Sequence, residues 1–270
     1  MSWTPRIRVG IGGWNFAPWR DNFYPAGWPE ARELEYAAQH VTAIEVNSTY
    51  YSAQKPATYA KWRDTAPEGF VFSLKASRYA TQKRVLAEAG ESVQRFIGSG
   101  IAELGDKLGP IVWQLAPTKV FDAQDLERFF SLLPDAVAGL KLRHALEVRH
   151  PSFASPEYVA LARRFNVTTV FTDALERFPV IADPTGSFVY ARLLSADSSM
   201  PTGYAPPVLD RWAEAARHWA AGAVDADLPR VQPSLQPTGQ PQDVFIYFIN
   251  GAKERAPAAA MALLERLNAG

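Results

Sequence analysis

Eight short apolar runs recur along the chain, and each is followed by a segment with helical periodicity. From Val9 to Ile246 the runs are spaced by about 34 residues, close to the length of one strand–helix unit. Eight strands that alternate with helices fit two architectures, a closed (β/α)8 barrel and an open doubly wound sheet. The runs span residues 7–12, 43–47, 71–75, 111–115, 145–149, 167–173, 188–193 and 244–250.

The residues that follow the runs favour the barrel. An open dinucleotide-binding sheet has G-x-G-x-x-G at its first helix, whereas here Gly10, Gly12 and Gly13 are followed by Trp14. Candidate ligand residues follow nearly every run, while an open sheet gathers them at one switch point. We therefore predict an α/β protein with a single TIM-barrel-like (β/α)8 domain over residues 1–270.

Start and stop signals predict the helices between the runs. An apolar stripe over residues 93–108 predicts a helix that Gly109-Pro110 ends. Asp122 and Pro134 bound a second helix, and Ser155-Pro156 opens a third that runs through Phe165. Further helices are expected near residues 30–40, 58–64, 209–219 and 257–267.

One stretch departs from this rhythm. Residues 222–242 hold four prolines, few large apolar residues and no periodicity. We predict a proline-rich, flexible insertion at the surface, placed before the last strand.

The composition excludes several classes of protein. Without cysteine, the chain has no thiolate nucleophile, iron–sulfur cluster or disulfide framework. Its 28 basic and 28 acidic residues argue against a polyanion binder held by global charge. Residues 1–13 lack the apolar stretch of a signal peptide, and no run of 18 apolar residues predicts a membrane span. We expect a soluble cytoplasmic protein without a membrane partner.

Alternation along the strands places polar side chains at one end of the predicted barrel. The outward face of each strand must be apolar because it meets helices, and the inward face ends at the carboxyl-terminal rim. In the second run Ile44 and Val46 share one face, so Glu45 and Asn47 lie on the other. Polar residues hold equivalent inward positions in five further strands: Ser73, Lys75, Gln114, Glu147, Arg149, Tyr190, Arg192 and Asn250.

This convergence has two interpretations, because buried charges need partners. It is either a ligand site at the functional end of the fold or an internal ion-pair network that fills the barrel mouth. The charged residues of this set carry one net positive charge, which suits a phosphate or carboxylate ligand. They are Lys75, Arg149 and Arg192, which are basic, and Glu45 and Glu147, which are acidic. Our candidate catalytic residues are Glu45, Glu147 and Asp173. Our candidate ligand-binding residues are Trp14, Asn47, Tyr50, Lys75, Gln114, Arg149, His150, Arg192 and Asn250.

Aromatic and basic residues follow the first three runs. Six aromatics lie within residues 14–28, and Tyr50-Tyr51 follows the second run. They either stack on a sugar or base, or pack together as a cover over the barrel, the interpretation we favour for Phe23 and Trp28. Residues 75–86 carry four cations and no acidic residue, a pattern shared by phosphate-binding loops and ordinary solvated loops.

No metal or other cofactor is expected. Glu147, His150 and Asp173 follow or end neighbouring runs and are a conceivable set of metal ligands. No H-x-H, H-E-x-x-H or aspartate-rich motif supports that set, and the chain has only four histidines.

Taken together, these motifs resemble the YecE-like family, a bacterial and archaeal domain of unknown function. Two segments are specific, E-V-N-S-T-Y-Y at 45–51 and E-V-R-H-P-S-F at 147–153. The likeness covers essentially the whole chain outside the insertion and includes G-G-W at 12–14, F-S-L-K-A at 72–76, Q-L-A-P at 114–117, Y-A-R at 190–192 and Y-F-I-N at 247–250. The resemblance implies a TIM-barrel-like fold and brings no established reaction.

The sequence departs from the common pattern of that family at three places. Gln82 stands where a histidine often occurs, Leu194-Ser195 replaces a usual His-Gly, and Gly251 replaces a common Asn or Asp. These departures remove acid–base groups and weaken a histidine-based or metal-based mechanism.

Three functions stay open at this point. The first is a metal-independent enzyme or ligand-binding protein for an anionic sugar or nucleotide, with Lys75 and two arginines on the anion and Glu45 or Glu147 as acid or base. The second is a nucleic-acid-binding or repair-type protein, by analogy of fold with TIM-barrel endonucleases. The third is a non-catalytic scaffold whose rim network is structural. The sequence does not indicate an oligomeric state.

Overall fold

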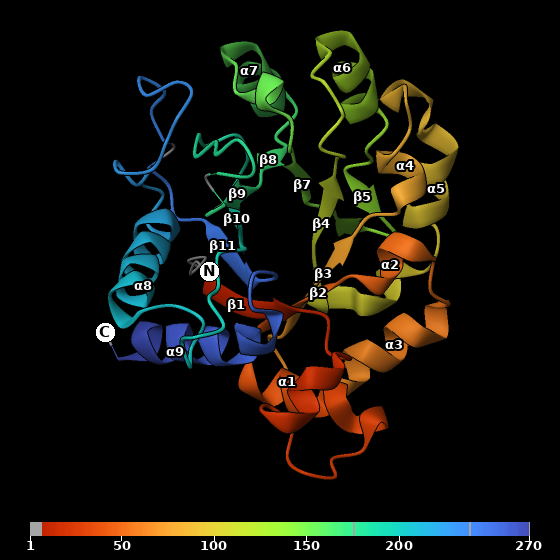
Figure 1. Ribbon diagram of the computed structural model, residues 1–270. Coiled ribbons are helices and arrows are strands. Elements are labelled where there is room, and N and C mark those ends of the chain that lie inside the picture. Colours follow the sequence, from red (N-terminus) through yellow and green to blue (C-terminus); the bar gives the residue numbers. More distant parts are fainter. Residues whose placement is uncertain (1–6, 175, 238, 270) are drawn as a thin grey trace.

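The computed structural model describes residues 7–174, 176–237 and 239–269. Residues 1–6, which hold part of the segment considered above for a signal peptide, lie outside that range, as does residue 238 of the predicted insertion. In the described part of the chain, parallel strands form the centre of the molecule and helices surround them (Figure 1).

Each of the eight apolar runs contains a strand, and the sixth run contains two short ones separated by Val170. The strands of the central sheet are β1 Ile7–Gly12, β2 Ala43–Val46, β3 Val71–Lys75, β4 Leu108–Gln114, β7 His144–Glu147, β8 Thr168–Thr169, β9 Phe171–Thr172, β10 Phe188–Leu193 and β11 Asp243–Phe248. The strands β5 Ala136–Val137 and β6 Leu140–Lys141 form a separate antiparallel hairpin.

The central sheet closes through its divided sixth strand. Hydrogen bonding orders the strands β8-β7-β4-β3-β2-β1-β11-β10-β9. At one end of this order β8 pairs with β7, at the other end β9 pairs with β10, and Val170 joins the two halves. Because both ends of the order belong to one strand, the sheet is barrel-shaped, and the predicted TIM-barrel-like fold is confirmed.

Helices follow the strands at the positions that the sequence signals indicate. The α-helices are α1 Glu33–His40, α2 Ser48–Tyr51, α3 Pro56–Thr65, α4 Arg78–Thr81, α5 Gly90–Ile97, α6 Ala123–Ser131, α7 Pro156–Arg164, α8 Pro206–Ala220 and α9 Ala256–Asn268. Short 3-10 helices are η1 Ala17–Asp21, η2 Glu30–Arg32, η3 Leu86–Glu88, η4 Ile101–Lys107, η5 Pro151–Phe153 and η6 Lys253–Arg255. The predicted caps are confirmed, since Asp122 and Ser155 accept backbone N–H groups at the starts of α6 and α7.

The helix predicted over residues 93–108 is wrong in its second half. Helix α5 ends at Ile97, and Gly100 follows with a φ of 106°, a left-handed conformation that stops an α-helix. The chain then forms the 3-10 helix η4, and Gly109 and Pro110 belong to strand β4 rather than to a helix end. The apolar stripe does lie against the core, but it is divided between α5, η4 and the first residue of β4.

The predicted alternation separates an inner and an outer core. Ile44 and Val46 pack outward into the large core between the strands and the helices. Ala43, Ala145 and Tyr247 pack inward into a second core that fills the barrel below its rim. The inward positions nearer the carboxyl ends of the strands are therefore left for polar side chains.

Residues 222–242 form no helix or strand in their described part. The segment is attached to the chain just before β10, where the Asp183 carboxylate accepts the backbone N–H groups of Val231 and Gln232 at 2.7 and 2.8 Å. The Ala182 N–H also donates to the Pro229 carbonyl at 2.9 Å. Flexibility of this segment stays a prediction.

Among the helices of the described residues, none combines the length and the apolar character needed to cross a bilayer.

Candidate functional site

Arg192 lies at the centre of a buried ion network at the carboxyl ends of the strands. Its Nε and Nη2 donate to the two carboxylate oxygens of Glu45, each at 3.0 Å, and its Nη1 donates to Oε2 of Glu147. The Tyr190 hydroxyl donates to Glu45 at 2.7 Å. All four side chains are buried, and the bidentate pairing holds the guanidinium in one orientation.

Glu147 is held ionised within this network. Gln114 and Arg149 donate to its two oxygens at 2.9 and 2.7 Å, in addition to Arg192. Burial raises the pKa of Glu147, but the positive charges of Arg192 and Arg149 outweigh that effect and hold the pKa at about 2. Conversely, burial lowers the pKa of Arg192, and the two glutamates raise it by more.

Strand register explains why these residues meet. Gln114 on β4 lies beside Glu147 on β7, and Glu45 on β2 lies between Gly12 on β1 and Ser73 on β3. Gly12 lines the rim beside Glu45, and a Cβ on it would lie only 3.1 Å from the Ile249 side chain and 3.2 Å from that of Asn47.

An open cavity of about 380 Å³ lies at this rim. Five cations line it, and its described lining residues include no aspartate or glutamate; the cations are Lys75, Arg149, Arg177, Arg192 and Lys253. The buried Glu45 and Glu147 balance two of these charges from below. A ligand would therefore meet three uncompensated positive charges.

The cations of the cavity are held by different contacts. The Arg149 guanidinium lies 4.6 Å from the ring centroid of Phe178, and the Lys253 ammonium lies 4.6 Å from that of Phe16. The Lys75 ammonium lies 4.2 Å from the ring centroid of Tyr50. Burial lowers the pKa of Lys253. Burial, together with the charge of Arg192, lowers the pKa of Lys75 to about 8, although the two glutamates oppose this shift.

The structure brings nine of the predicted site residues together. Glu45 and Glu147 lie beneath the cavity, and the Tyr50 ring packs against Lys75. The predicted residues that line the cavity are Asn47, Lys75, Gln114, Arg149, Arg192 and Asn250. Their roles stay predictions.

Three predicted site residues lie apart from the cavity lining. Trp14 packs edge-on against Trp62 of α3, with ring centroids 5.2 Å apart. The His150 Nδ1 lies 2.8 Å from the Ser152 hydroxyl at the start of η5. The Asp173 carboxylate accepts the Leu194 N–H at 2.6 Å and the Tyr204 hydroxyl at 2.8 Å, and burial raises the pKa of Asp173.

Other residues of the cavity were missed, and one reached it differently than predicted. Arg177 and Phe178 lie after β9, and Lys253 lies after β11. Their position a few residues after a strand was a usable signal, since this end of the fold carries the site. Strand alternation turns Ile249 inward after Tyr247, so Asn250 reaches the cavity from the exposed loop beyond β11 rather than from the inward face.

No three histidine, aspartate or glutamate side chains of the described residues are grouped as a metal site. Of the conceivable set named above, Glu147 bonds to Arg192 and Arg149, while His150 and Asp173 bond elsewhere.

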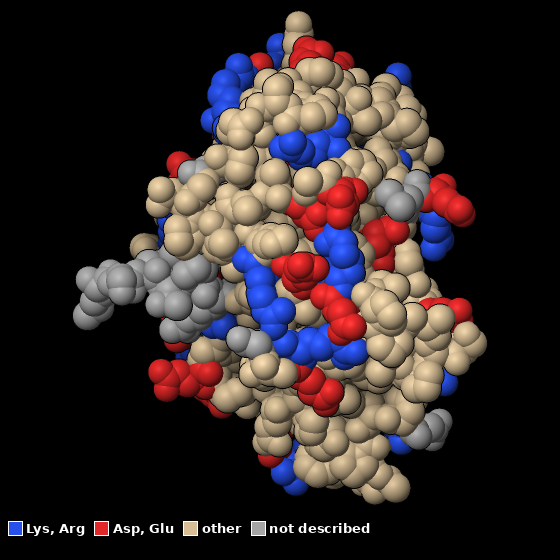
Figure 2. All heavy atoms as spheres, turned by 90° about the vertical axis from the view of Figure 1, so that its left-hand side faces the viewer, with Lys and Arg blue, Asp and Glu red and all other residues tan. Residues whose placement is uncertain are grey.

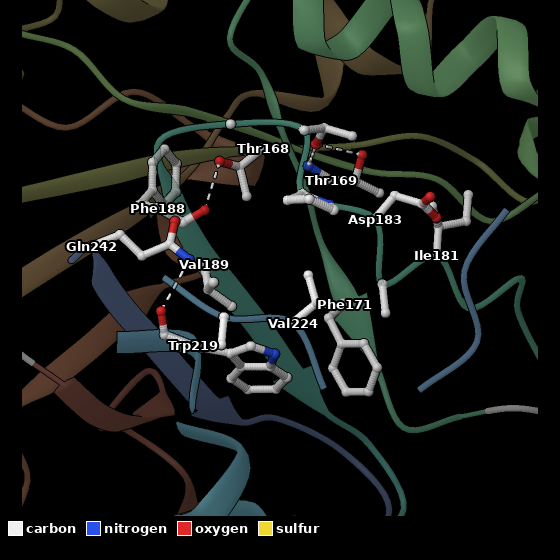
Figure 3. A pocket seen from close by; sticks show the side chains of 15 residues that line it. Thr168, Thr169, Phe171, Ile181, Asp183, Phe188, Val189, Trp219, Val224 and Gln242 are labelled. Carbon is white, nitrogen blue, oxygen red and sulfur yellow. Dashed lines mark hydrogen bonds between the residues drawn. The ribbon is translucent and has the colours of Figure 1, made fainter. Parts of the chain in front are cut away.

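A second cavity lies near the amino ends of β8, β10 and β11 (Figure 3). Its volume of about 40 Å³ is that of one or two waters. Hydrogen bonds between its own lining groups, Gln242 to the Trp219 carbonyl and Thr168 to the Phe188 carbonyl, satisfy much of its polar surface. This cavity is a packing gap rather than a ligand site.

A closed parallel barrel with a polar cavity at the carboxyl ends of its strands defines a TIM-barrel-like protein. The chain belongs to the family described as protein of unknown function DUF72, whose model matches residues 8–270. The resemblance to the YecE-like family is thereby confirmed. UPF0759 protein YecE of Escherichia coli is 28% identical over 147 residues, 54% of this chain and 50% of that protein. The match thus spans about half the length of this curated relative.

Solved structures support the same fold. A DUF72 family protein of Thermotoga maritima is 20% identical with a TM-score of 0.72, and the alignment covers 97% of this chain and 99% of that one. A DUF72 family protein of Enterococcus faecalis is 18% identical with a TM-score of 0.70, covering 97% and 96%. SacUVDE is 12% identical with a TM-score of 0.58, covering 98% and 99%. At these identities the likeness concerns the fold alone.

Proposed function

We propose that this protein binds, and acts on, a small molecule that carries a phosphate or carboxylate group. The observation that carries the proposal is the lining of the rim cavity, where five cations and no described carboxylate face the ligand. A net excess of three positive charges around this open cavity favours an anion. The volume of about 380 Å³ suits a sugar phosphate or a mononucleotide.

Glu147 beneath the cavity and Lys75 in its lining have different roles in this proposal. Because the pKa of Glu147 is held at about 2, this group is no general acid near neutral pH, and it anchors Arg149 and Arg192 instead. Lys75, with a pKa of about 8, is the cavity residue best suited to exchange a proton at physiological pH. Independence of a metal ion stays part of this proposal.

The test is a thermal-unfolding screen with inorganic phosphate, sugar phosphates, mononucleotides and the matching uncharged sugars and nucleosides. We expect anionic compounds to raise Tm and their uncharged counterparts to have no effect. Arg177→Met removes an exposed lining cation and should weaken the shift, whereas Arg95→Met, on the exposed face of α5, should leave it unchanged. A screen without any anion-dependent shift would contradict the proposal.

A single-stranded nucleic acid is the second candidate ligand. Tyr51 and Tyr79 are both 61% exposed, and the Arg78 guanidinium lies 5.7 and 5.4 Å from their ring centroids. Such an aromatic–cation surface beside the cavity can stack bases. Figure 2 shows the side of the molecule away from α2 and α4, where basic and acidic side chains are interleaved, so a bound strand would find no uniformly basic track on that side.

Binding of a labelled single-stranded oligonucleotide, followed by fluorescence anisotropy over a salt series, tests this second candidate. Binding at low salt that weakens steeply as salt rises, and is lost in Arg78→Met, would support it. Absence of binding at low salt would remove it.

A further inference from the structure

Lys75 differs from the two arginines beside it in the cavity. Arg149 and Arg192 each donate to a buried glutamate, whereas the Lys75 ammonium has no ion pair or hydrogen bond within the described part of the chain. Its close contact is the face of the Tyr50 ring, at 4.2 Å. The backbone at this position is fixed, because the Thr49 hydroxyl donates to the Lys75 carbonyl at 2.7 Å. A half-buried amine without a counter-ion therefore faces the cavity.

The charged groups around this amine come from three strands. Arg192 from β10 and Arg149 after β7 are positive, and Glu45 from β2 and Glu147 from β7 are negative but already bonded to the arginines. The burial of the amine and the charge of Arg192 outweigh the attraction of the two glutamates, which explains why the pKa of Lys75 is lowered to about 8. About one amine in ten is then unprotonated at pH 7, against fewer than about one in a thousand for an exposed lysine.

These surroundings fit a nucleophile better than a simple counter-ion. Desolvation and a neighbouring cation are the two effects by which proteins activate a lysine toward carbonyl carbon. The Tyr50 ring presents its face to the nitrogen and can stabilise a positively charged product as well as the ammonium.

We propose that Lys75 forms a Schiff base with a small anionic aldehyde or ketone bound in the rim cavity. The inference rests on the proposed function, because the other cations hold the anionic group while the carbonyl carbon approaches Nζ. The neutral amine attacks that carbon, the carbonyl oxygen becomes the hydroxyl of a carbinolamine, and a proton passes from nitrogen to oxygen. Loss of this hydroxyl with the remaining amine proton, as water, forms the C=N bond. No oxidant or reductant takes part.

The experiment traps this bond in the intact protein. The probe is pyridoxal 5′-phosphate, an aldehyde with a phosphate group, and sodium cyanoborohydride reduces the imine to a stable amine that peptide mass mapping locates. At pH 7 we expect Lys75 to be labelled on the order of tenfold faster than the exposed Lys55 and Lys61. Pyridoxal, which lacks the phosphate, should lose most of this preference, and inorganic phosphate should protect Lys75.

Two variants separate the nucleophile from the charge. Lys75→Arg keeps the positive charge and removes the reactive amine, so the fast labelling should vanish while phosphate still raises Tm. Lys61→Arg, its matched control outside the cavity, should leave labelling of Lys75 unchanged. If Lys75→Arg fails to fold, the comparison of Lys75 with Lys55 and Lys61 within the wild-type chain decides the question alone.

The outcomes distinguish the two proposals. A phosphate-dependent rise in Tm with labelling of Lys75 no faster than that of Lys61 would overturn the Schiff base and keep the anion site. Fast labelling of Lys75 by both pyridoxal and its phosphate, without protection by inorganic phosphate, would keep the nucleophile and overturn the anion site. If phosphate did not raise Tm and Lys75 were labelled no faster than Lys61, both the anion site and the Schiff base would be overturned.

Discussion

At Arg192 two glutamates share one guanidinium, which is buried with them. Arg192→Met would leave both carboxylates without their principal cation in a low-dielectric site. We expect the free energy of unfolding to fall by about 3–5 kcal/mol, measured by urea denaturation. Arg95→Met, an exposed matched control, should change it by less than about 0.5 kcal/mol. A loss under about 1 kcal/mol at Arg192 would show that the network is not a structural unit.

The low pKa of Glu147 predicts how the free energy of unfolding depends on pH. Its pKa of about 2 in the folded protein lies below the ordinary value of 4.5. Ionisation therefore stabilises the fold above the ordinary value, and this stabilisation is lost as pH falls toward 2. The difference in unfolding free energy between wild type and Glu147→Gln should shrink between about pH 5 and pH 2. Parallel stability curves for the two proteins would contradict the assignment.

Lys75 has the opposite relation to stability. The pKa of Lys75 in the folded protein is about 8, below its ordinary value of 10.5, so protonation of this amine opposes folding. The free energy of unfolding should therefore rise between about pH 8 and pH 10.5. Lys75→Met should therefore be more stable than wild type at pH 7, by about 1 kcal/mol, with the gain disappearing above the ordinary pKa. Urea unfolding at the two ends of this range measures it, and a destabilised variant at pH 7 would assign Lys75 to the structural network.

At the scale of single residues, positions on a strand or just beyond its end could be predicted, whereas contacts between distant parts of the chain could not. Glu45, Lys75 and Arg192 alternate with apolar neighbours, and a period of two decides which face they take. The contact of Trp14 with Trp62, in contrast, joins the loop after β1 to α3, and no local pattern encodes it. His150 bonds to Ser152, two residues ahead, and caps η5 locally.

Among the elements, the break between α5 and η4 depends on a single glycine. A Cβ on Gly100 would lie 2.7 Å from the Pro56 side chain at a φ that disfavours other residues. Gly100→Ala should cost about 1–3 kcal/mol of unfolding free energy. Gly90→Ala, at the start of α5 with its nearest neighbour at 3.5 Å, should be neutral or stabilising. Equal effects at both glycines in urea unfolding would contradict this account of the break.

The break between α5 and η4 also shows which feature of a helix an apolar sequence pattern does not reveal. The apolar spacing over residues 93–108 marks buried side chains correctly, but a stripe of this kind does not reveal a left-handed residue within it. Caps are more local, because Asp122 and Ser155 bond to a backbone N–H three residues ahead. They could therefore be predicted, whereas the Gly100–Pro56 contact joins parts of the chain far apart in sequence.

Across the whole molecule, the closed barrel gathers charges from β2, β3, β7 and β10 that the net charge of zero conceals. The barrel could be predicted because eight runs recur at one spacing. The positions of Arg177 and Lys253 a few residues after a strand were a usable signal, but loop conformations, which the sequence pattern does not encode, decide that both side chains line the cavity.

Crystals soaked in tungstate, an electron-dense analogue of phosphate, would show whether the rim cavity binds an anion. We expect an anomalous-difference peak within the cavity, in contact with Lys75, Arg149 and Arg177, that is lost or weakened in Arg177→Met crystals. A cavity open to solvent in the crystal that shows no peak, with tungstate bound only at surface lysines elsewhere, would contradict it.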